Sequence, residues 1–376
     1  MNASKANKIR ILYLVSRLRQ VGPGFQLYNL IRHLDRNRFQ PYIITLSPEG
    51  QHSLIESFRN IEVTCDSLGL PRVAGMIFGP GRIRKLLEKN PADLVHVFDY
   101  RATLLCANHP MGIARVVTCR QSYRHIFGPI LGSVMKKTFL KASGKCERVV
   151  AVSHAIGDLV KHELSRPIEV IHNGVDTERF KPVSEERRRS LRLQLGLPPG
   201  KRVFVSAGFL SKNKGVPTLI EAFLKGTDGR ADVLVLLGDG PLRERCLRLA
   251  AGRDNVRIVG FVQNVEDYLA AADAFVSASL TEGCPNAVME AMACGLPVVL
   301  SDIPPHREIL ALDERAGQVF TAGDVTSLLR ALSRTPQMNQ SERSAAALGI
   351  IKNHFDAAGM SLKYQELYAQ LCDRAG

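Results

Sequence analysis

The sequence predicts an α/β protein made of two doubly wound domains, each a parallel sheet covered by helices. The chain has 376 residues, which is too many for one ordinary core and suits two domains of about 150–200 residues each. Short apolar runs alternate with longer amphipathic stretches, which is the pattern of βαβ units. The alternation stops in a turn-rich, charged stretch at 176–200 and then starts again, so we place the junction between the domains there.

Each expected strand is a short apolar run bounded by turn residues. In the first half the strands are Ile9–Val15, Tyr42–Leu46, Asp93–Phe98, Arg115–Thr118, Arg148–Val152 and Glu169–Ile171. Gly22-Pro23-Gly24 predicts a turn, leucines at helical spacing predict a helix over Phe25–Leu34, and Ser153 suits a helix N-cap. In the second half the strands are Val203–Ala207, Asp232–Leu237, Val256–Val259, Ala274–Ser277 and Pro297–Leu300, with helices at Pro217–Leu224, Leu242–Ala251, Val265–Ala271 and Ala287–Cys294.

The composition excludes several classes of protein. Hydrophobic residues make up 45% and charged residues 23%, near the averages of globular proteins, so disorder, collagen and coiled coils are excluded. The longest apolar runs fall far below the roughly 18 residues of a membrane span, and the basic N-terminus lacks a signal-peptide core. The eight cysteines form no C-x-x-C pair and have no histidine at ligand spacing, so we expect reduced thiols and no metal. We expect a cytoplasmic protein, or one on the inner face of the membrane.

Positive charge is concentrated in the first half of the chain. The whole chain carries 50 basic and 36 acidic residues, a net charge of +14. Residues 1–178 hold 25 Lys and Arg against 14 Asp and Glu, or +11, and residues 179–376 hold 25 against 22, or +3. This asymmetry predicts an anionic partner of the first half, which is nucleic acid, a lipid surface or a phosphorylated acceptor.

Two loops of the second half carry glycine between a strand and a helix, one at Gly208–Gly215 and one at Gly238. The first also holds Lys212 and Lys214, and backbone amides with ammonium groups at such a place suit a pyrophosphate. Glycine turns between a strand and a helix are common, so ordinary turns remain the alternative for each loop.

Glu282 and Glu290 form the most specific pattern in the sequence. Seven residues separate them, and a loop with glycine and proline opens a helix at about Asn286. Both carboxylates can then face one crevice, while loop amides at the helix N-terminus face an anion. Carboxylates accept hydrogen bonds from paired hydroxyls, so this segment predicts a nucleotide-sugar site. The alternative is that both glutamates are solvated, but Glu290 stands in an otherwise apolar helix and needs a hydrogen-bond partner.

With these residues in view, the sequence resembles a retaining glycosyltransferase of family 4 (glycosyl transferases group 1) with the GT-B fold, over essentially the whole chain. The matching pieces are Gly22-Pro23-Gly24, Val150–Ser153, His172–Asp176 with Phe180, Gly208–Gly215, Gly238–Leu242, Gly260–Val262, Glu282–Pro297, Ser301–Pro304 with Arg307-Glu308, and His354-Phe355 with Tyr364 and Tyr368. The resemblance implies two Rossmann-like domains facing across a cleft. The acceptor-side domain is expected at 1–178, the nucleotide-sugar domain at 179–355, and a C-terminal helix that crosses back to the first domain at 356–376.

The resemblance also implies roles for residues. Glu290 would hold the ribose hydroxyls, Glu282 the transferred sugar and Lys214 the diphosphate, so Glu282 and Lys214 are expected to be catalytic. The Gly22–Gly24 turn would approach the phosphates, and the backbone around Val262 the base. The expected donor-binding residues are Gly22, Gly24, Gly208, Lys212, Lys214, Gly238, Val262, Glu282, Gly283, Cys284, Pro285, Asn286 and Glu290. Such enzymes need no metal and no cofactor, because lysine and helix dipoles stabilise the leaving diphosphate, and a UDP-sugar is the favoured donor.

Two positions depart from the family pattern. Phe209 stands where an arginine usually follows the glycine of the phosphate loop, and Lys212 could supply the missing charge. Arg120 stands where a histidine often lies near the acceptor, with His125 five residues further on. We expect Arg120 to take a catalytic position, holding an anionic acceptor or the phosphates; a plain surface residue is the alternative.

Ile130–Lys145 has two interpretations. Its apolar residues stand at helical spacing, with an edge at Leu131, Met135 and Phe139, and lysines lie on or beside the polar face. The lysines are Lys136, Lys137, Lys141 and Lys145. A basic amphipathic helix predicts an element that lies on an anionic membrane surface. The alternative is an ordinary domain helix whose apolar face packs inward.

The leading hypothesis is a cytoplasmic, membrane-peripheral glycosyltransferase of the hexosyltransferase class. It would move a sugar from a nucleotide diphosphate sugar to a glycan or lipid-linked acceptor, in cell-surface polysaccharide biosynthesis. The enzyme alternative is a nucleotide-sugar epimerase or another GT-B enzyme. A basic nucleic-acid-binding protein is a remote alternative, because no nucleic-acid-binding motif is present and aromatic residues make up only 6%. A dehydrogenase is disfavoured, since no strand is followed by G-x-G-x-x-G.

Overall fold

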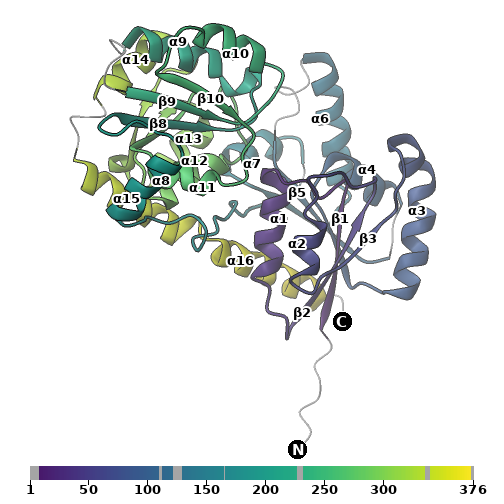
Figure 1. The fold of residues 1–376 in the computed structure, drawn as a ribbon. Helices are drawn as coiled ribbons and strands as arrows, with labels where there is room; N and C mark the ends of the chain where they lie inside the picture. The colour runs from purple at the N-terminus through teal and green to yellow at the C-terminus, as the bar shows by residue number, and fades with distance from the viewer. Residues whose placement is uncertain are drawn as a thin grey trace, which may run out of the picture. The chain divides into compact units, whose positions relative to one another are not determined.

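The computed structural model describes residues 8–109, 112–121, 129–164, 166–226, 232–334 and 339–373. The chain divides into two compact units, Met1–Gly174 with Ala357–Gly376, and Val175–Asp356. The sequence analysis placed these junctions at 178/179 and 355/356. Figure 1 shows each unit as a sheet with helices packed against it.

The first unit has a parallel seven-stranded sheet in the order β3-β2-β1-β4-β5-β6-β7. The strands are β1 (Ile9–Val15), β2 (Phe39–Thr45), β3 (Thr64–Ser67), β4 (Leu94–Val97), β5 (Ala114–Cys119), β6 (Arg148–Ala151) and β7 (Ile168–Val170). The helices are α1 (Gly22–Arg32), α2 (Ile55–Arg59), α3 (Arg72–Lys89), α4 (Tyr100–Asn108), α6 (Pro129–Ser143), α7 (His154–Lys161) and α16 (Ala357–Asp373). Ile9 of β1 pairs with Phe39 of β2. The central strands are buried on both faces, as parallel strands covered by helices are.

The second unit has a parallel six-stranded sheet in the order β10-β9-β8-β11-β12-β13. Its strands are β8 (Arg202–Ala207), β9 (Asp232–Leu237), β10 (Val256–Gly260), β11 (Ala274–Ser277), β12 (Val298–Ser301) and β13 (Gly317–Phe320). Its helices are α8 (Glu185–Gln194), α9 (Val216–Gly226), α10 (Arg243–Ala250), α11 (Val265–Ala271), α12 (Asn286–Ala293), α13 (Pro304–Leu310), α14 (Val325–Arg334) and α15 (Gln340–His354), with short 3₁₀ turns η1 (Lys212–Lys214) and η2 (Glu314–Ala316).

The strand order of the second unit positions the site. The chain runs outward from β8 to β9 and β10 on one side, and from β11 to β12 and β13 on the other. Open parallel sheets bind ligands at the carboxyl ends of the strands on either side of such a switch point. In this unit those positions are the loops after β8 and β11, which contain Gly208–Gly215 and Glu282.

The prediction of two doubly wound, Rossmann-like domains is confirmed. The structure adds elements that were not expected: β3, β13, α2, α3, α4, α8, α13, α14 and α15. The expected turn at Gly22-Pro23-Gly24 is wrong, because these residues form the first turn of α1. Pro23 fits there because a helix leaves its first amides unpaired and proline has none to offer. A Cβ on Gly24 would lie 2.0 Å from the Arg19 carbonyl oxygen, so glycine allows this close approach.

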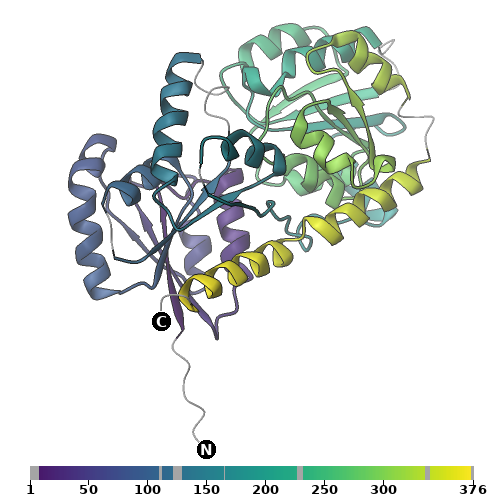
Figure 2. The same cartoon turned by 180° about the vertical axis from the view of Figure 1, so that it is seen from behind.

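Helix α16 completes the core of the first unit beside α1 (Figure 2). The Tyr368 hydroxyl lies 2.7 Å from His96 Nδ1 on β4, and the Tyr364 hydroxyl lies 3.1 Å from Thr118 Oγ1 on β5. The expected return of the C-terminal helix to the first domain is therefore confirmed. Across the described ranges, no helix combines the length and the apolar character needed to cross a membrane.

Candidate functional site

The loops after β8 and β11 touch at the carboxyl edge of the second sheet. The amide of Leu280 donates to the carbonyl of Asn213 at 2.7 Å. Gly215 has a φ of +60°, and a Cβ there would lie 2.0 Å from the Ala278 carbonyl oxygen. Only glycine fits both the backbone angle and the contact, so this position holds the two loops together.

The loop after β9 packs on the loop after β8 in the same way. A Cβ on Gly238 would lie 2.0 Å from the carbonyl oxygen of Gly208, and both residues have positive φ. A Cβ on Gly208 would in turn lie 3.6 Å from Cε of Lys214. The structure thus brings Gly208, Gly238 and Lys214 together. Close backbone packing alone accounts for the two glycines, and their contact with a phosphate stays a prediction.

Lys214 and Glu282 form a largely buried ion pair. Nζ of Lys214 lies 2.6 Å from Oε1 of Glu282, and their side chains are 30% and 13% exposed. Ser279 Oγ donates to the same oxygen at 2.7 Å, so Oε2 is left without a hydrogen bond to any described residue. Burial raises the pKa of the Glu282 carboxyl, but attraction to Lys214 and hydrogen bonds from Lys214 and Ser279 outweigh burial and hold the pKa below its ordinary value. Glu282 is therefore a carboxylate with one free oxygen.

Glu290 lies on α12, where the buried neighbours Met289 and Ala291 surround it in sequence. Its carboxyl makes no hydrogen bond to any residue that the structure describes. Burial raises the pKa of Glu290 to about 7; attraction to Arg179 opposes the rise, and repulsion by Glu266 adds to it. A carboxyl in this state is a strong acceptor without a partner.

Arg179 and Ser279 are residues that the sequence analysis missed. Arg179 donates to Glu266 Oε2 at 2.7 Å and to the Gln263 carbonyl at 3.0 Å. Its guanidinium therefore forms its ion pair with Glu266 and not with Glu290. Arg179 stands directly before Phe180, which the family resemblance did include. Ser279 lies just past β11, at the switch point. Ser279 could have been found from the sequence, because it follows the end of an expected strand. No local sequence pattern identifies Arg179.

The other donor-binding residues predicted in the second unit lie on its loops, on η1 and at the start of α12. Gly283, Cys284 and Pro285 form the loop that leads into α12, and Asn286 begins the helix as expected. Cys284 Sγ lies 3.9 Å from Met289 Sδ. Val262 packs half-buried against the core of this unit. Lys212 is exposed on η1 and pairs with no acid of the described ranges, and the Phe209 side chain beside it is 61% exposed.

The predicted residues Gly22, Gly24 and Arg120 belong to the first unit, and the structure brings them together there. Nη1 of Arg120 donates to the carbonyl of Pro23 at 3.2 Å, between the two glycines. The guanidinium also stacks on the Phe98 ring, with its carbon 4.4 Å from the ring centroid. Arg120 thus ties the end of β5 to the start of α1. His125 lies outside the described residues.

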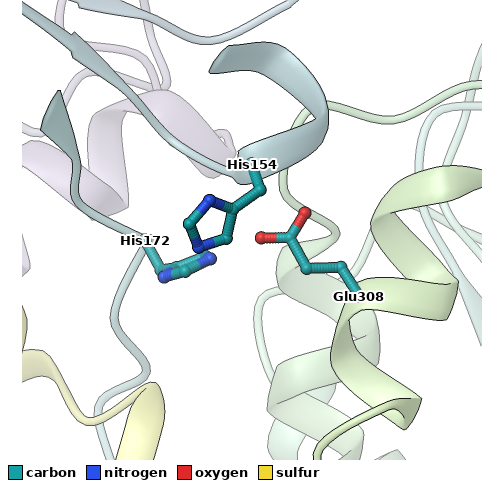
Figure 3. Close-up of side chains that lie close together, drawn as sticks. All are labelled: His154, His172 and Glu308. Carbon is teal, nitrogen blue, oxygen red and sulfur yellow. The ribbon is translucent and has the colours of Figure 1, made fainter. Parts of the chain in front are cut away.

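His154 and His172 lie edge to face in the first unit, with ring centroids 5.6 Å apart (Figure 3). His154 begins α7, and His172 follows β7. Glu308, drawn with them, stands on α13 of the second unit. Two imidazoles are fewer than the three or four protein ligands of a zinc site, so the pair carries no metal assignment. The expectation that the protein needs no metal stays a prediction.

Comparison with known proteins matches both halves of the chain. The family model described as Glycosyltransferase Family 4 matches residues 22–179, and that described as Glycosyl transferases group 1 matches residues 201–336. TuaC of Bacillus subtilis (strain 168) is 36% identical over 169 residues, which span 44% of this chain and 41% of TuaC. That match therefore covers less than half of either protein.

A longer match joins this chain to an Escherichia coli protein named UDP-Gal:alpha-D-GlcNAc-diphosphoundecaprenol alpha-1,3-galactosyltransferase. The two are 28% identical over 273 residues, which is 66% of this chain and 68% of the relative. Among solved structures, Anabaena Alr3699/HepE in complex with UDP-glucose superposes with a TM-score of 0.83 at 19% identity, covering 96% of this chain and 100% of HepE. At this identity the likeness shows a shared fold.

Proposed function

We propose that this chain, which belongs to the group 1 and family 4 glycosyltransferases and has their GT-B fold, is a retaining transferase of a sugar from a nucleotide diphosphate sugar to a glycan or lipid-linked acceptor. The observation that carries the proposal is Glu290, whose half-buried carboxyl has no hydrogen-bond partner among the described residues and a pKa of about 7. Burying a strong acceptor unpaired is costly, so its retention points to a ligand that supplies the donors. The two hydroxyls of a ribose are such donors.

Lys214 and Glu282 would divide the rest of the donor between them. The Lys214 ammonium would bind the diphosphate, and the free Oε2 of Glu282 would accept from hydroxyls of the transferred sugar. Negative charge grows on the diphosphate as the glycosidic bond breaks, so a fixed cation stabilises the transition state more than the ground state. The exposed Lys212 would add a second cation in place of the arginine that Phe209 replaces.

The stereochemical course follows from the family. In a retaining reaction on one face of the sugar, a phosphate oxygen of the donor can take the acceptor proton, so no protein base is required. Arg120 of the first unit is assigned to an anionic group of the acceptor or to the donor phosphates. Its contact with the Pro23 carbonyl supports a role in holding the start of α1, where Gly22 and Gly24 stand.

The comparisons support a UDP-sugar donor and a lipid-linked acceptor. The Escherichia coli relative is named for UDP-Gal and a diphosphoundecaprenol-linked sugar, and HepE was crystallised with UDP-glucose. We propose that this chain acts in cell-surface polysaccharide biosynthesis, at the cytoplasmic face of a membrane. The epimerase alternative lacks support, because the matching families and the named relative are transferases.

We also propose that the first unit binds an anionic membrane, through residues that only partly match those expected. Phe139 of α6 is buried, and Lys136 pairs with Glu163 at 2.5 Å, so neither faces a lipid surface. Six of the exposed apolar side chains in the first unit come from α6 and α3, and α4 packs against both helices. They are Ile130, Leu131 and Val134 on α6, and Val73, Ile77 and Phe78 on α3, with exposures from 56% to 83%. We call these six residues the apolar surface.

Lysines and arginines flank the apolar surface. Lys137 and Lys141 are exposed on α6, and Arg82, Arg84 and Lys85 are exposed on α3. Apolar side chains beside basic ones fit the boundary between headgroups and acyl chains of an anionic bilayer, and such attachment is reversible.

The transfer reaction is tested with purified protein, a panel of UDP-sugars and a lipid-linked glycan acceptor. We expect one sugar to be transferred with release of UDP, a product anomer the same as that of the donor by proton NMR, and activity that survives excess chelator. An inverted product would remove the proposed mechanism. If the protein binds a UDP-sugar but transfers no sugar, it would be assigned to another class of enzyme with the same fold.

A further inference from the structure

His306 stands at the far end of a chain of hydroxyl groups that begins at Glu282. Ser279 Oγ donates to Glu282 Oε1 at 2.7 Å. Ser277 Oγ lies 3.2 Å from Ser279 Oγ and 3.4 Å from His306 Nε2. The serines and the histidine are buried, with His306 fully so, which keeps water out of the chain. The structure therefore connects a buried imidazole to the proposed sugar-binding carboxyl through two hydroxyls.

The tautomer of His306 follows from its other nitrogen. Nδ1 lies 2.9 Å from the Ser301 carbonyl oxygen, and a carbonyl oxygen only accepts, so Nδ1 carries the hydrogen. Burial lowers the pKa of His306 to about 4, which makes the ring neutral at pH 7 and leaves Nε2 as an acceptor. Nε2 is thus an acceptor held in place by the backbone of Ser301.

His306 Nε2 and Ser279 Oγ then compete for the hydrogen of the Ser277 hydroxyl. The Ser279 hydrogen is committed to Glu282, because a carboxylate can only accept. The single hydrogen of Ser277 can go to His306 Nε2 or to Ser279 Oγ, and a bond to Ser279 polarises that hydroxyl and strengthens its bond to Glu282. The orientation of the Ser277 hydroxyl therefore depends on His306 and acts on Glu282.

We propose that His306 is a positioning residue for Glu282, acting through Ser277 and Ser279. This rests on the proposed function, in which Glu282 binds the transferred sugar and Lys214 the diphosphate. Without a donor, Lys214 and Ser279 both hold Oε1. When the diphosphate binds Lys214, Glu282 keeps the hydrogen bond from Ser279. The chain of hydroxyls then sets the orientation of the Glu282 carboxyl. The charges of the same two groups also act on the ring: attraction to Glu282 raises the pKa of His306, and repulsion by Lys214 lowers it.

Two substitutions at residue 306 separate positioning from a purely structural role. Asparagine places its amide nitrogen near the Nδ1 position and keeps the bond to Ser301, whereas glutamine reaches the Nε2 position and keeps a partner for Ser277. We expect His306→Gln to retain kcat within about threefold and His306→Asn to lower kcat about tenfold, which is the size of one hydrogen bond. UDP affinity, measured by calorimetry, should stay unchanged in both, because UDP carries no transferred sugar. A larger loss of kcat in His306→Gln than in His306→Asn would overturn the proposal.

A double-mutant cycle tests the chain itself. Ser277→Ala should lower kcat as much as His306→Asn, and the double variant should lose no more than either single variant, because both break one chain. Losses that multiply would mean independent structural roles and would also overturn the proposal.

An NMR readout needs no turnover. The Nε2 signal of His306 in protein labelled with ¹⁵N-histidine, identified by its absence in His306→Asn, should move on Glu282→Gln and stay in place on Glu290→Gln. In the Ser277→Ala background, Glu282→Gln should no longer move it, whereas a field effect through space would persist. A signal that ignores Glu282 refutes the positioning role. A protein inactive on every nucleotide sugar but with this signal behaviour would refute the proposed function and leave the hydroxyl chain standing.

Discussion

Glu282 and Glu290, separated by seven residues on one loop and helix, have pKa values shifted in opposite directions. Burial raises the pKa of both carboxyls. At Glu282 the ion pair with Lys214 reverses the effect, whereas at Glu290 the nearby Arg179 is engaged with Glu266 and the pKa stays at about 7. Two carboxyls whose environments separate their pKa values are typical of sites where each has its own task.

Glu290→Gln should stabilise the free protein at alkaline pH. Between pH 4.5 and about 7 the folded protein keeps a proton on Glu290 that the unfolded chain releases, so this group lowers stability progressively as pH rises through that window. The variant removes this cost, and we expect a gain of about 1–3 kcal/mol at pH 8 that disappears near pH 4.5. Urea unfolding at both pH values measures it, with the exposed Glu186→Gln as control. An unchanged stability at pH 8 would mean that Glu290 is solvated.

The same substitution should weaken binding of UDP. A carboxylate accepts from both ribose hydroxyls, whereas an amide offers one oxygen, and we expect a loss of about tenfold to a hundredfold in affinity. In the wild type, affinity should fall as pH drops below 7, because protonation removes an acceptor; in Glu290→Gln the profile should be flat in that range. Calorimetry between pH 5.5 and 8 distinguishes these profiles, and a change of less than about threefold at pH 8 would end the ribose assignment.

Lys214→Met should destabilise the protein at neutral pH because it leaves Glu282 buried without its counter-ion. We expect a loss of about 2–4 kcal/mol, below the full cost of a deeply buried pair since Lys214 is 30% exposed. The lowered pKa of Glu282 means that the pair contributes stability above pH 4.5 and loses it as pH falls further, so wild type and variant should converge under acid conditions. The double variant Lys214→Met with Glu282→Gln should recover stability but not turnover. A double variant as unstable as the single one would mean that packing of the lysine chain, not charge, is lost.

Binding to anionic vesicles should depend on the apolar surface. Ile130→Ser with Phe78→Ser should reduce sedimentation with anionic vesicles at least tenfold, because each fully buried side chain of this size contributes about 1.5–3 kcal/mol. Lys137→Gln and Lys141→Gln should each cost about 1 kcal/mol, and high salt should weaken binding. Lys136→Gln is the matched control, since Lys136 already pairs with Glu163 and should have little effect. Equal binding to neutral and anionic vesicles, or none, would make the basic half a docking face for an acceptor in solution.

Tyr368→Phe should loosen α16. The substitution removes the hydroxyl that lies 2.7 Å from His96 Nδ1, and leaves a buried nitrogen without its partner. We expect a loss of about 1–3 kcal/mol, read from urea midpoints, together with faster amide exchange in α16. Tyr268→Phe is the control, because its hydroxyl makes no hydrogen bond to a described residue. Equal midpoints for the two variants would mean that the Tyr368 hydroxyl does not help to hold α16.

Most of the fold could be predicted from the sequence because its signals are local. Apolar runs such as Asp232–Leu237 and Ala274–Ser277 become β9 and β11 at the expected bounds, and Ser153 caps α7 as expected. The errors have identifiable causes. Glycine and proline at Gly22–Gly24 are turn formers, but proline equally suits the first turn of a helix. The lysine at residue 136 looked free because its partner Glu163 lies on another segment.

The sequence by itself determined that Glu282 and Glu290 share a loop and helix beside glycine loops with lysines, and the family that this pattern indicates. Spacing along a chain carries that information, since a turn followed by a helix places its own residues. The tertiary structure alone decided that Lys214 meets Glu282 across 68 residues, that Glu290 has no hydrogen-bond partner among the described residues, and that His306 reaches Glu282 through two serines. These relations depend on parallel strand order, which brings the carboxyl ends of distant strands to one edge. Burial then sets the charges there, and the burial of each carboxyl depends on residues that are distant in the sequence.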